Sequence, residues 1–268
     1  MKAVNDNRVN ELLMGLAEFG KTDQGITRLA YSDEDRAAQN WLLTQVADLG
    51  LEMREDAVGN VFLRRKGEDD TLPAVATGSH LDTVIHGGMY DGMCGVVGAL
   101  EALYMLKDVK LKRSVEVIIF RAEESSRFGF ATIGSKLMSG NGSPEGFSKA
   151  AKKGELSYVE ALANWGCNPA NYKEAIIQPG TYKSLAKFTL SKAKCWKKLA
   201  SKLALSIILQ RPPVLKFISR VWQTTPALLL WASAGTHLLA VPSLFWRWKL
   251  LQRMKRTMEP LVLLALWM

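Results

Sequence analysis

Five residues in the first half of the chain carry groups that could bind metal ions and activate water. They are His80, Asp82, Asp91, Glu123 and Glu124. Each follows an apolar, strand-like run or lies in a turn beside glycine, where a rigid sheet could direct the side chains to one point. Imidazole nitrogens and carboxylate oxygens are common ligands of zinc and related divalent metals. Their order and spacing therefore predict a hydrolytic centre that holds two metal ions.

The sequence around these residues resembles a known family over about residues 8–183. The motifs that carry the resemblance are Gly78–Thr83, Gly87–Gly92, Ala122–Gly129 and Ala131–Ser135. They are similar to those of the zinc-dependent hydantoinase/carbamoylase amidohydrolases, which include the N-carbamoyl-L-amino-acid hydrolases and the allantoate amidohydrolases. The resemblance implies two divalent metal ions, zinc or manganese, and a small-molecule substrate with a linear amide or ureido C–N bond. It also implies a homodimer.

Each candidate residue has its own expected role. His80 would bind one metal through an imidazole nitrogen, Asp91 would bridge both metals, and Glu124 would bind the second. Asp82 lies two residues after His80 and would accept the other imidazole N–H, which fixes the tautomer and raises the basicity of the ligand. Glu123 is the expected general base, because neighbours in sequence point in different directions and one carboxylate can bind metal while the other takes a proton from water.

Simpler explanations exist for each group taken alone. His80 could be a hydrogen-bonded histidine of the core, and Glu123–Glu124 could be the solvated start of a helix. Neither explanation accounts for the occurrence of all the groups together in this order. Arg127 either contacts a substrate carboxylate or pairs with a surface acid, and the sequence does not separate the two. His86 is expected to lie in a loop outside the centre.

The elements around the candidates alternate between helix and strand patterns. A helix is predicted to begin after the cap residue Ser32 and to end at Gly50, because its apolar residues share one stripe. These residues are Ala37, Ala38, Trp41, Leu42, Val46 and Leu49. A strand pair is expected next, through Met53 and Val61–Leu63.

Two buried strands should carry the reactive groups at their carboxyl ends. Pro73–Thr77 precedes His80, Ser114–Phe120 precedes Glu123–Glu124, and apolar spacing from Val96 to Leu106 predicts a helix between these strands. Functional residues at the ends of such strands are typical of α/β folds. The predicted class is α/β, and the resemblance implies a partial catalytic domain of the aminoacylase/zinc-exopeptidase type.

The two parts of the chain differ in charge. Residues 1–175 contain 25 acidic and 20 basic side chains, whereas residues 176–268 contain 1 acidic and 15 basic. Six of the eight tryptophans follow residue 190, and the positive net charge of the chain, +9, comes entirely from residues 176–268, because residues 1–175 are net negative. A basic surface can bind nucleic acid. The tail has no glycine-rich or aromatic-interleaved binding module, so we predict no nucleic-acid partner.

Cysteine usage and the amino terminus indicate a cytoplasmic protein. Cys94, Cys167 and Cys195 are far apart with no paired spacing, and no amino-terminal stretch has the apolar core of a signal peptide. Cys94 follows Asp91 by three residues, which suggests a nucleophile as one hypothesis. Its apolar neighbours favour a buried packing role instead.

The chain departs from the family after Tyr182–Lys183. The family continues with a His-Ile-Glu-Gln-Gly segment that carries another metal-binding histidine, then a lid domain and a final ligand histidine, and none of these occurs here. Synonymous codons for Phe188–Ala193 can be chosen so that a shifted frame encodes His-Ile-Glu-Gln-Gly. At the same offset, Arg220–Trp231 can yield Gly-Val-Ala-Asp-His-Ser-Gly-Ala-Thr-Pro-Met, which resembles the lid motif. We therefore predict that residues 184–268 are an out-of-frame tail without a designed fold, and that residues 1–183 are the family's amino-terminal part.

A membrane anchor is the competing interpretation of the tail. Pro226–Trp246 is largely apolar, is nearly long enough to span a bilayer, and is followed by Arg247 and Lys249. His237 and Pro242 weaken this interpretation. The predicted function is a metal-dependent amidohydrolase by ancestry, inactive in this chain because ligands are missing. The alternative is a non-catalytic remnant whose apolar tail associates with membranes.

Overall fold

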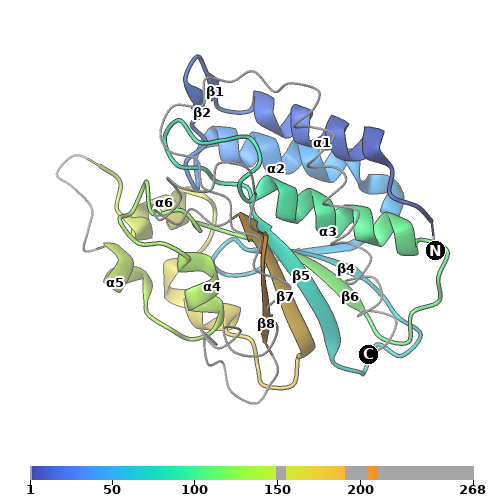
Figure 1. The fold of residues 1–268 in the computed structure, drawn as a ribbon. Coiled ribbons are helices and arrows are strands. Elements are labelled where there is room, and N and C mark those ends of the chain that lie inside the picture. Colours follow the sequence, from blue (N-terminus) through green and yellow to red (C-terminus); the bar gives the residue numbers. More distant parts are fainter. Residues whose placement is uncertain (1, 149–154, 191–204, 211–268) are drawn as a thin grey trace, which may run out of the picture.

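A six-stranded mixed sheet forms the centre of the structure, a computed structural model that describes residues 2–148, 155–190 and 205–210 (Figure 1). The strands lie in the order β3-β4-β6-β5-β7-β8. Their bounds are β3 Glu52–Glu55, β4 Val61–Arg65, β5 Ala74–His80, β6 Val115–Phe120, β7 Tyr182–Leu190 and β8 Leu205–Gln210. β5 is parallel to both β6 and β7, and the other neighbours are antiparallel. A short hairpin joins β1 (Lys21–Thr22) to β2 (Gly25–Ile26).

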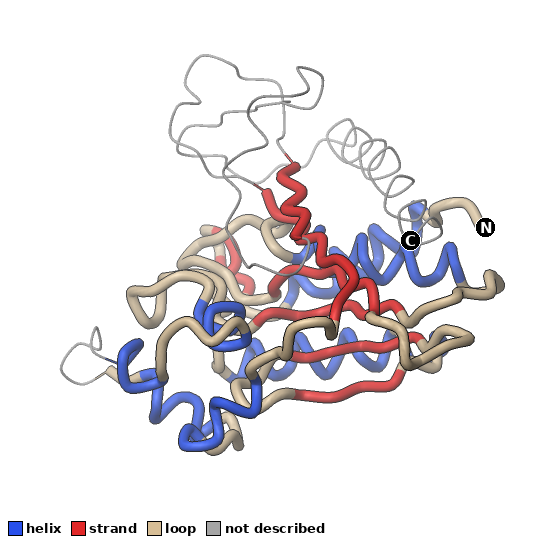
Figure 2. The backbone as a smooth tube through the Cα atoms, turned by 90° about the horizontal axis from the view of Figure 1, so that it is seen from below, coloured by secondary structure: helices blue, strands red, loops and turns tan. Residues whose placement is uncertain are grey.

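The helices form two groups. α1 (Asp6–Glu18), α2 (Asp33–Gln45) and α3 (Met93–Leu106) lie together over one face of the sheet (Figure 1). α4 (Ile133–Met138), α5 (Pro144–Ser148) and α6 (Tyr158–Asn164) lie to one side, as Figure 2 also shows from below. Two 3-10 helices, η1 (Ala47–Leu49) and η2 (Pro169–Ala175), complete the described elements. This arrangement of helices around a mixed sheet confirms the predicted α/β class.

The predicted helix after Ser32 is α2. The Ser32 hydroxyl accepts a hydrogen bond from the backbone N–H of Asp35 at 3.2 Å, which satisfies one of the open donors of the first turn. The α-helix ends at Gln45, earlier than the sequence predicts, and continues as η1 to Gly50, whose φ of 61° is left-handed. The apolar stripe therefore covers an α-helix and a tighter turn that together reach the predicted end.

Parallel pairing brings the ends of β5 and β6 to the same edge of the sheet. His80, the last residue of β5, is in register with Phe120, the last residue of β6. The chain reaches β6 on one side of β5 and β7 on the other, so the carboxyl end of β5 lies where the strand order reverses. Ligand sites of open α/β sheets form at such points.

The core between the sheet and α1–α3 is continuous. Every residue of α3 is buried, because this helix lies between the sheet and α1. A second, aromatic cluster supports α4–α6 and contains Tyr31, Phe128, Tyr158 and Trp165. The two clusters fix the segments on either side of the sheet edge where the candidate residues lie.

Most of the predicted tail lies outside the described residues. The predicted boundary between residues 183 and 184 falls inside β7, whose pairing with β5 continues to Lys187. The apolar segment 226–246 is not among the residues described. Within the described part of the chain, none of the helices is both long enough and apolar enough to cross a membrane.

Candidate metal centre

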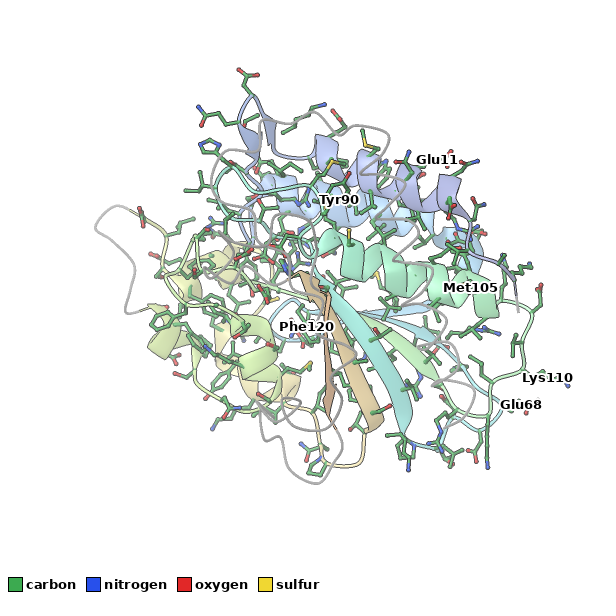
Figure 3. The ribbon with its side chains drawn as sticks, viewed as in Figure 1. Glu11, Glu68, Tyr90, Met105, Lys110 and Phe120 are labelled. Carbon is green, nitrogen blue, oxygen red and sulfur yellow. The ribbon has the colours of Figure 1, made fainter. Side chains whose placement is uncertain are left out.

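The candidate residues gather at the carboxyl ends of β5 and β6. Figure 3 labels Phe120 at this end of β6 and Tyr90 in the loop that leads to α3. The ion pair between Lys110 Nζ and Glu68 Oε1, 3.8 Å long, lies at the opposite end of the sheet. Residues that are up to 44 positions apart, from His80 to Glu124, thus meet at one edge.

The His80 ring is held in one orientation. Its Nδ1 lies 2.9 Å from the main-chain oxygen of Asp82. A carbonyl oxygen can only accept a hydrogen bond, so Nδ1 carries the proton and Nε2 of the neutral ring carries a lone pair. Nε2 lies 3.6 Å from Glu123 Oε2 and 4.0 Å from Asp91 Oδ1, and the ring is only 1% exposed. The lone pair therefore faces carboxylates, which have no proton to offer it when ionised.

Asp82 contacts both halves of the centre. Its carboxylate accepts the backbone N–H groups of Glu123 at 3.3 Å and Glu124 at 2.9 Å, and its Oδ1 lies 3.5 Å from Nδ1 of His80. The sequence predicts the carboxylate as the acceptor for the imidazole, whereas the nearer acceptor is the main-chain oxygen. Burial alone would raise the pKa of Asp82, but the contacts with His80 and the two N–H groups outweigh it and leave the pKa below its ordinary value.

The donor set fits a divalent metal ion. One ligand atom each from His80, Glu123 and Glu124 lie within 4.8 Å of one another. Clustered ionised carboxylates repel each other, and an imidazole lone pair aimed at them adds to the repulsion unless a cation lies between. Nitrogen and oxygen donors of this kind suit zinc, and carboxylate-rich sets also suit manganese. Asp91 reaches the same ring nitrogen from the loop before α3.

Gly92 makes the close approach of α3 to His80 possible. Its φ is 68°, and a Cβ built at this position would lie 2.5 Å from the His80 main-chain oxygen and 2.6 Å from the ring atoms Nδ1 and Cε1. A side chain would therefore displace the imidazole, besides straining the backbone. The close contact with His80 thus explains why the residue after Asp91 is a glycine.

Three other sequence candidates lie apart from the metal-binding groups. Cys94 is buried in the core, where burial raises the pKa of its thiol, so it does not resemble an activated nucleophile. His86 is exposed in a loop. Arg127 donates from Nη1 to the main-chain oxygen of Ala30 at 2.5 Å, which ties two loops together.

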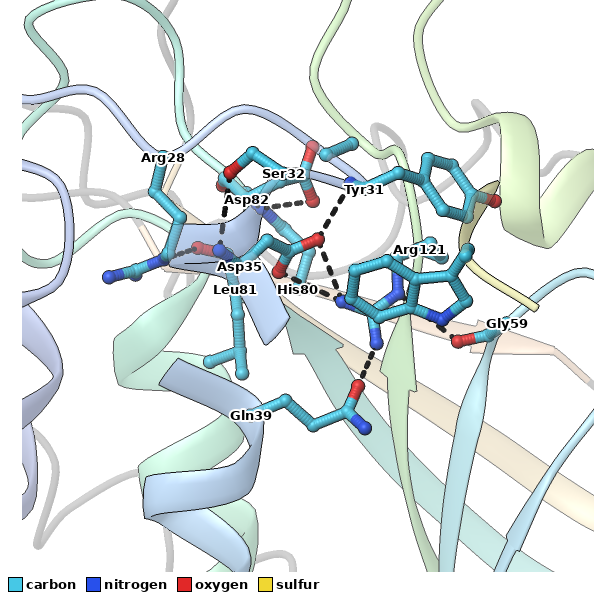
Figure 4. Close-up of polar contacts among 12 residues, drawn as sticks. Arg28, Tyr31, Ser32, Asp35, Gln39, Gly59, His80, Leu81, Asp82 and Arg121 are labelled. Carbon is cyan, nitrogen blue, oxygen red and sulfur yellow. Dashed lines mark hydrogen bonds and ion pairs between the residues drawn. The ribbon is translucent and has the colours of Figure 1, made fainter. Parts of the chain in front are cut away.

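Two buried arginines support the centre and were not singled out in the sequence. Arg28 donates to the main-chain oxygen of Leu81 at 2.9 Å (Figure 4). It also donates to the main-chain oxygens of Leu16 at 2.6 Å and Phe19 at 2.9 Å. Arg121 lies two residues before Glu123 and is fully buried. Arginine inside an apolar run, as in Ile26–Ala30 and Val115–Ala122, is the signal that could have identified them, because an arginine is rarely buried without partners.

Comparison with known proteins supports the resemblance. The profile of peptidase family M28 matches residues 60–184. The N-carbamoyl-L-amino acid amidohydrolase of Geobacillus stearothermophilus is 33% identical over 194 residues, which are 71% of this chain and 47% of that protein. The allantoate amidohydrolase of Bacillus subtilis is 36% identical over 172 residues, 63% of this chain and 42% of its own length. Over this part, the chain is similar to hydantoinase/carbamoylase amidohydrolases.

A solved structure agrees with this relationship. A hydantoinase/carbamoylase family amidase from Burkholderia ambifaria aligns with a TM-score of 0.58 and 32% sequence identity, over 62% of this chain and 42% of the amidase. The chain spans less than half the length of the relatives that it matches. The profile match ends at residue 184, next to the point where the motif resemblance ends.

Proposed function

We propose that residues 1–183 are the amino-terminal part of a metal-dependent hydrolase of linear amide or ureido C–N bonds. The observation that carries the proposal is the buried His80 at the end of β5. Its Nε2 faces the carboxylate of Glu123, which follows the parallel strand β6, and that of Asp91 in the loop before α3. Relatives are named for N-carbamoyl amino acids, allantoate and ureidoglycolate, all of which contain a ureido group. A ureido compound is therefore the proposed substrate class.

The residues divide into holding and proton-transfer roles. His80 and Asp91 would hold one metal ion, and Asp91 and Glu124 the other. When bound, the metal ions supply Lewis-acid stabilisation of the charge that develops on the carbonyl oxygen. Glu123 would take the proton of the attacking water, and Asp82 keeps the imidazole and the acid pair in place. Glu123 lies as close to His80 as the proposed ligand Asp91 does, so mutation is needed to decide which carboxylate is the base and which binds metal.

We also propose that the chain as given is inactive. Each metal ion would have two protein ligands of the three expected, and the missing histidines belong to the segment that the tail replaces. The end of the family match at residue 184 and the shifted motifs after Phe188 support an out-of-frame tail. An incomplete ligand set should bind metal weakly and leave the reacting carbonyl without its lid.

Restoring the reading frame tests the proposal. The encoding DNA is sequenced around Lys183–Phe188, one base is inserted or deleted to restore the shifted frame, and ammonia release is measured from N-carbamoyl amino acids and allantoate with Zn²⁺ or Mn²⁺. We expect activity in the repaired protein and none in the 268-residue chain. An early stop codon in the new frame, or a repaired product inactive on every substrate, would favour the non-catalytic alternative.

The role of each acidic residue is tested in the same repaired protein. Glu123→Gln should retain its metal and lose turnover by a factor on the order of 10²–10⁴, because only proton transfer is removed. His80→Ala should lose metal, which elemental analysis of the purified protein measures. Equal metal loss in both variants would mean that Glu123 is a ligand.

A further inference from the structure

Arg121 lies two residues before the turn that contains Glu123 and Glu124, and its guanidinium group is held by several contacts. Its Nη1 is 2.8 Å from both Oδ1 and Oδ2 of Asp35, its Nη2 donates to Oε1 of Gln39, and its Nε donates to the main-chain oxygen of Gly59 at 3.1 Å (Figure 4). Both partners of the ion pair are at most 1% exposed. All three residues that bind the guanidinium group therefore lie outside β6, the strand that Arg121 follows.

The ion pair is itself fixed by neighbouring elements. Asp35 belongs to the first turn of α2, and its Oδ2 also accepts the backbone N–H of Tyr31 at 2.9 Å. The Arg121 guanidinium carbon lies 4.5 Å from the centre of the Trp165 ring, which follows α6. α2 and the segment after α6 thus meet at Arg121, one from each helix group.

The backbone after Arg121 adopts a conformation that needs support. Ala122 has a φ of 49°, which is left-handed and unfavourable for a residue with a Cβ. On one side, the Arg121 N–H donates to Asn60 Oδ1 at 2.8 Å, and its main-chain oxygen accepts from Gly134 N–H at 3.0 Å. On the other side, Asp82 holds the amides of Glu123–Glu124. A strained residue persists where both flanks are held in this way.

A buried ion pair is weak evidence for a purely stabilising role. Desolvation offsets much of its attraction, and apolar residues of similar volume often replace such pairs without loss of stability. The Asp35–Arg121 pair is distinguished by its position, because Arg121 lies two residues before Glu123 and Asp35 lies in the first turn of α2. We propose that the Asp35–Arg121 pair is a positioning pair that holds the Glu123–Glu124 turn in its metal-binding orientation.

The predicted effect on metal binding rests on the proposed function, whereas the order of the Glu123–Glu124 turn can be measured separately from metal binding. In the full 268-residue chain, hydrogen exchange of the peptide that contains Glu123–Glu124 reports on the amides held by Asp82, and a titration with Zn²⁺ alone reports on metal affinity. The variants are Asp35→Asn and the double variant Asp35→Leu, Arg121→Met. The double variant replaces both charges by apolar groups and should remain folded.

Glu101→Gln is the matched control. Glu101 is fully buried and pairs with Arg8 Nε at 2.7 Å, so its substitution also removes a buried carboxylate from an ion pair, but from one that links α1 to α3 and whose arginine is 28% exposed. We expect both Asp35 variants to accelerate exchange in the Glu123–Glu124 peptide by about tenfold or more. We expect them to weaken Zn²⁺ binding about 10–100-fold, whereas the control changes neither.

The outcomes separate the two proposals. Exchange at Glu123–Glu124 that stays at the unsubstituted rate in a folded double variant would overturn the positioning role. Acceleration equal to that in Glu101→Gln would also overturn it, because it would reflect general destabilisation. If the unsubstituted chain and His80→Ala take up Zn²⁺ equally, the metal centre is wrong, and the exchange comparison still decides whether the pair holds the turn.

Discussion

Replacing Gly92 by alanine should displace the imidazole of His80. The new methyl group would lie 2.5 Å from the His80 main-chain oxygen and 2.6 Å from ring atoms, far inside van der Waals contact. The ring would have to move, and its Nδ1 would lose the 2.9 Å contact with the Asp82 main-chain oxygen. The same substitution also places a Cβ at a φ of 68°.

Gly50→Ala is the comparison for the clash, because it places an alanine at positive φ where the new methyl group meets no other atom. Gly50 has a φ of 61°, but a Cβ there meets nothing within 4 Å, so this variant incurs only the cost of a left-handed alanine, about 1–2 kcal/mol. Overpacking in a core costs about 1–3 kcal/mol, and a lost hydrogen bond about 1 kcal/mol. Gly92 has a ψ of −53°, outside the left-handed helical region that Gly50 occupies with a ψ of 38°, so its backbone is less favourable still for alanine. We therefore expect Gly92→Ala to reduce the free energy of unfolding by at least roughly 2 kcal/mol more than Gly50→Ala does.

Two measurements check this expectation. Urea unfolding followed by far-ultraviolet circular dichroism gives the free energy of each variant, and a Zn²⁺ titration gives its metal affinity. Gly92→Ala should weaken Zn²⁺ binding and Gly50→Ala should not. The reasoning is refuted if the two variants are equally stable, or if Gly92→Ala binds Zn²⁺ as tightly as the unsubstituted chain.

Three further predictions concern metal, thiols and a helix cap. Zn²⁺ at about 100 times its Kd should raise the free energy of unfolding by about 2.7 kcal/mol, and His80→Ala should abolish the rise; stabilisation that persists would place the ion elsewhere. At pH 8, iodoacetamide should modify Cys167 slowly and Cys94 only after unfolding in urea, because burial raises the pKa of Cys167 to about 11 and that of Cys94 further. Peptide mass spectrometry distinguishes the two, and rapid native labelling of Cys94 would contradict the assignment. Ser157→Ala should cost about 1 kcal/mol in the same urea assay, since the capping box with Glu160 is lost, and no change would show that the box is not stabilising.

Local signals in the sequence predict the elements that carry the centre. Ser32 before an apolar stripe indicates α2, and the uninterrupted apolar runs before His80 and Glu123 indicate β5 and β6. α1 has comparable signals, an Asn5 cap and apolar residues at Val9, Leu12, Leu13 and Leu16. Parallel pairing of β5 and β6 follows from the strand-helix-strand order, so the meeting of the reactive groups could be anticipated.

The supporting contacts could not be read from local patterns. Asp35 looks like an ordinary acidic residue in the first turn of a helix, where it would favour the helix dipole. Its partner Arg121 lies 86 residues away, and only the tertiary fold, which places the first turn of α2 beside the residue that follows β6, brings the two charges together. The main-chain acceptor for His80 was missed for another reason: a backbone oxygen carries no signature in the sequence.

Asp82 holds the centre with two chemically separate parts of one residue. Its carbonyl oxygen meets the imidazole, while its carboxylate meets the amides that precede both glutamate side chains. Alanine scanning reports only on the second part, because truncation leaves the peptide group behind. An Asp82→Ala variant with little effect on metal binding by His80 would therefore give no information about the contact between the ring and the Asp82 carbonyl oxygen. Backbone amide-to-ester replacement also retains this carbonyl. Information about that contact has to come from the ring itself, for example from the nitrogen chemical shifts that distinguish the two tautomers.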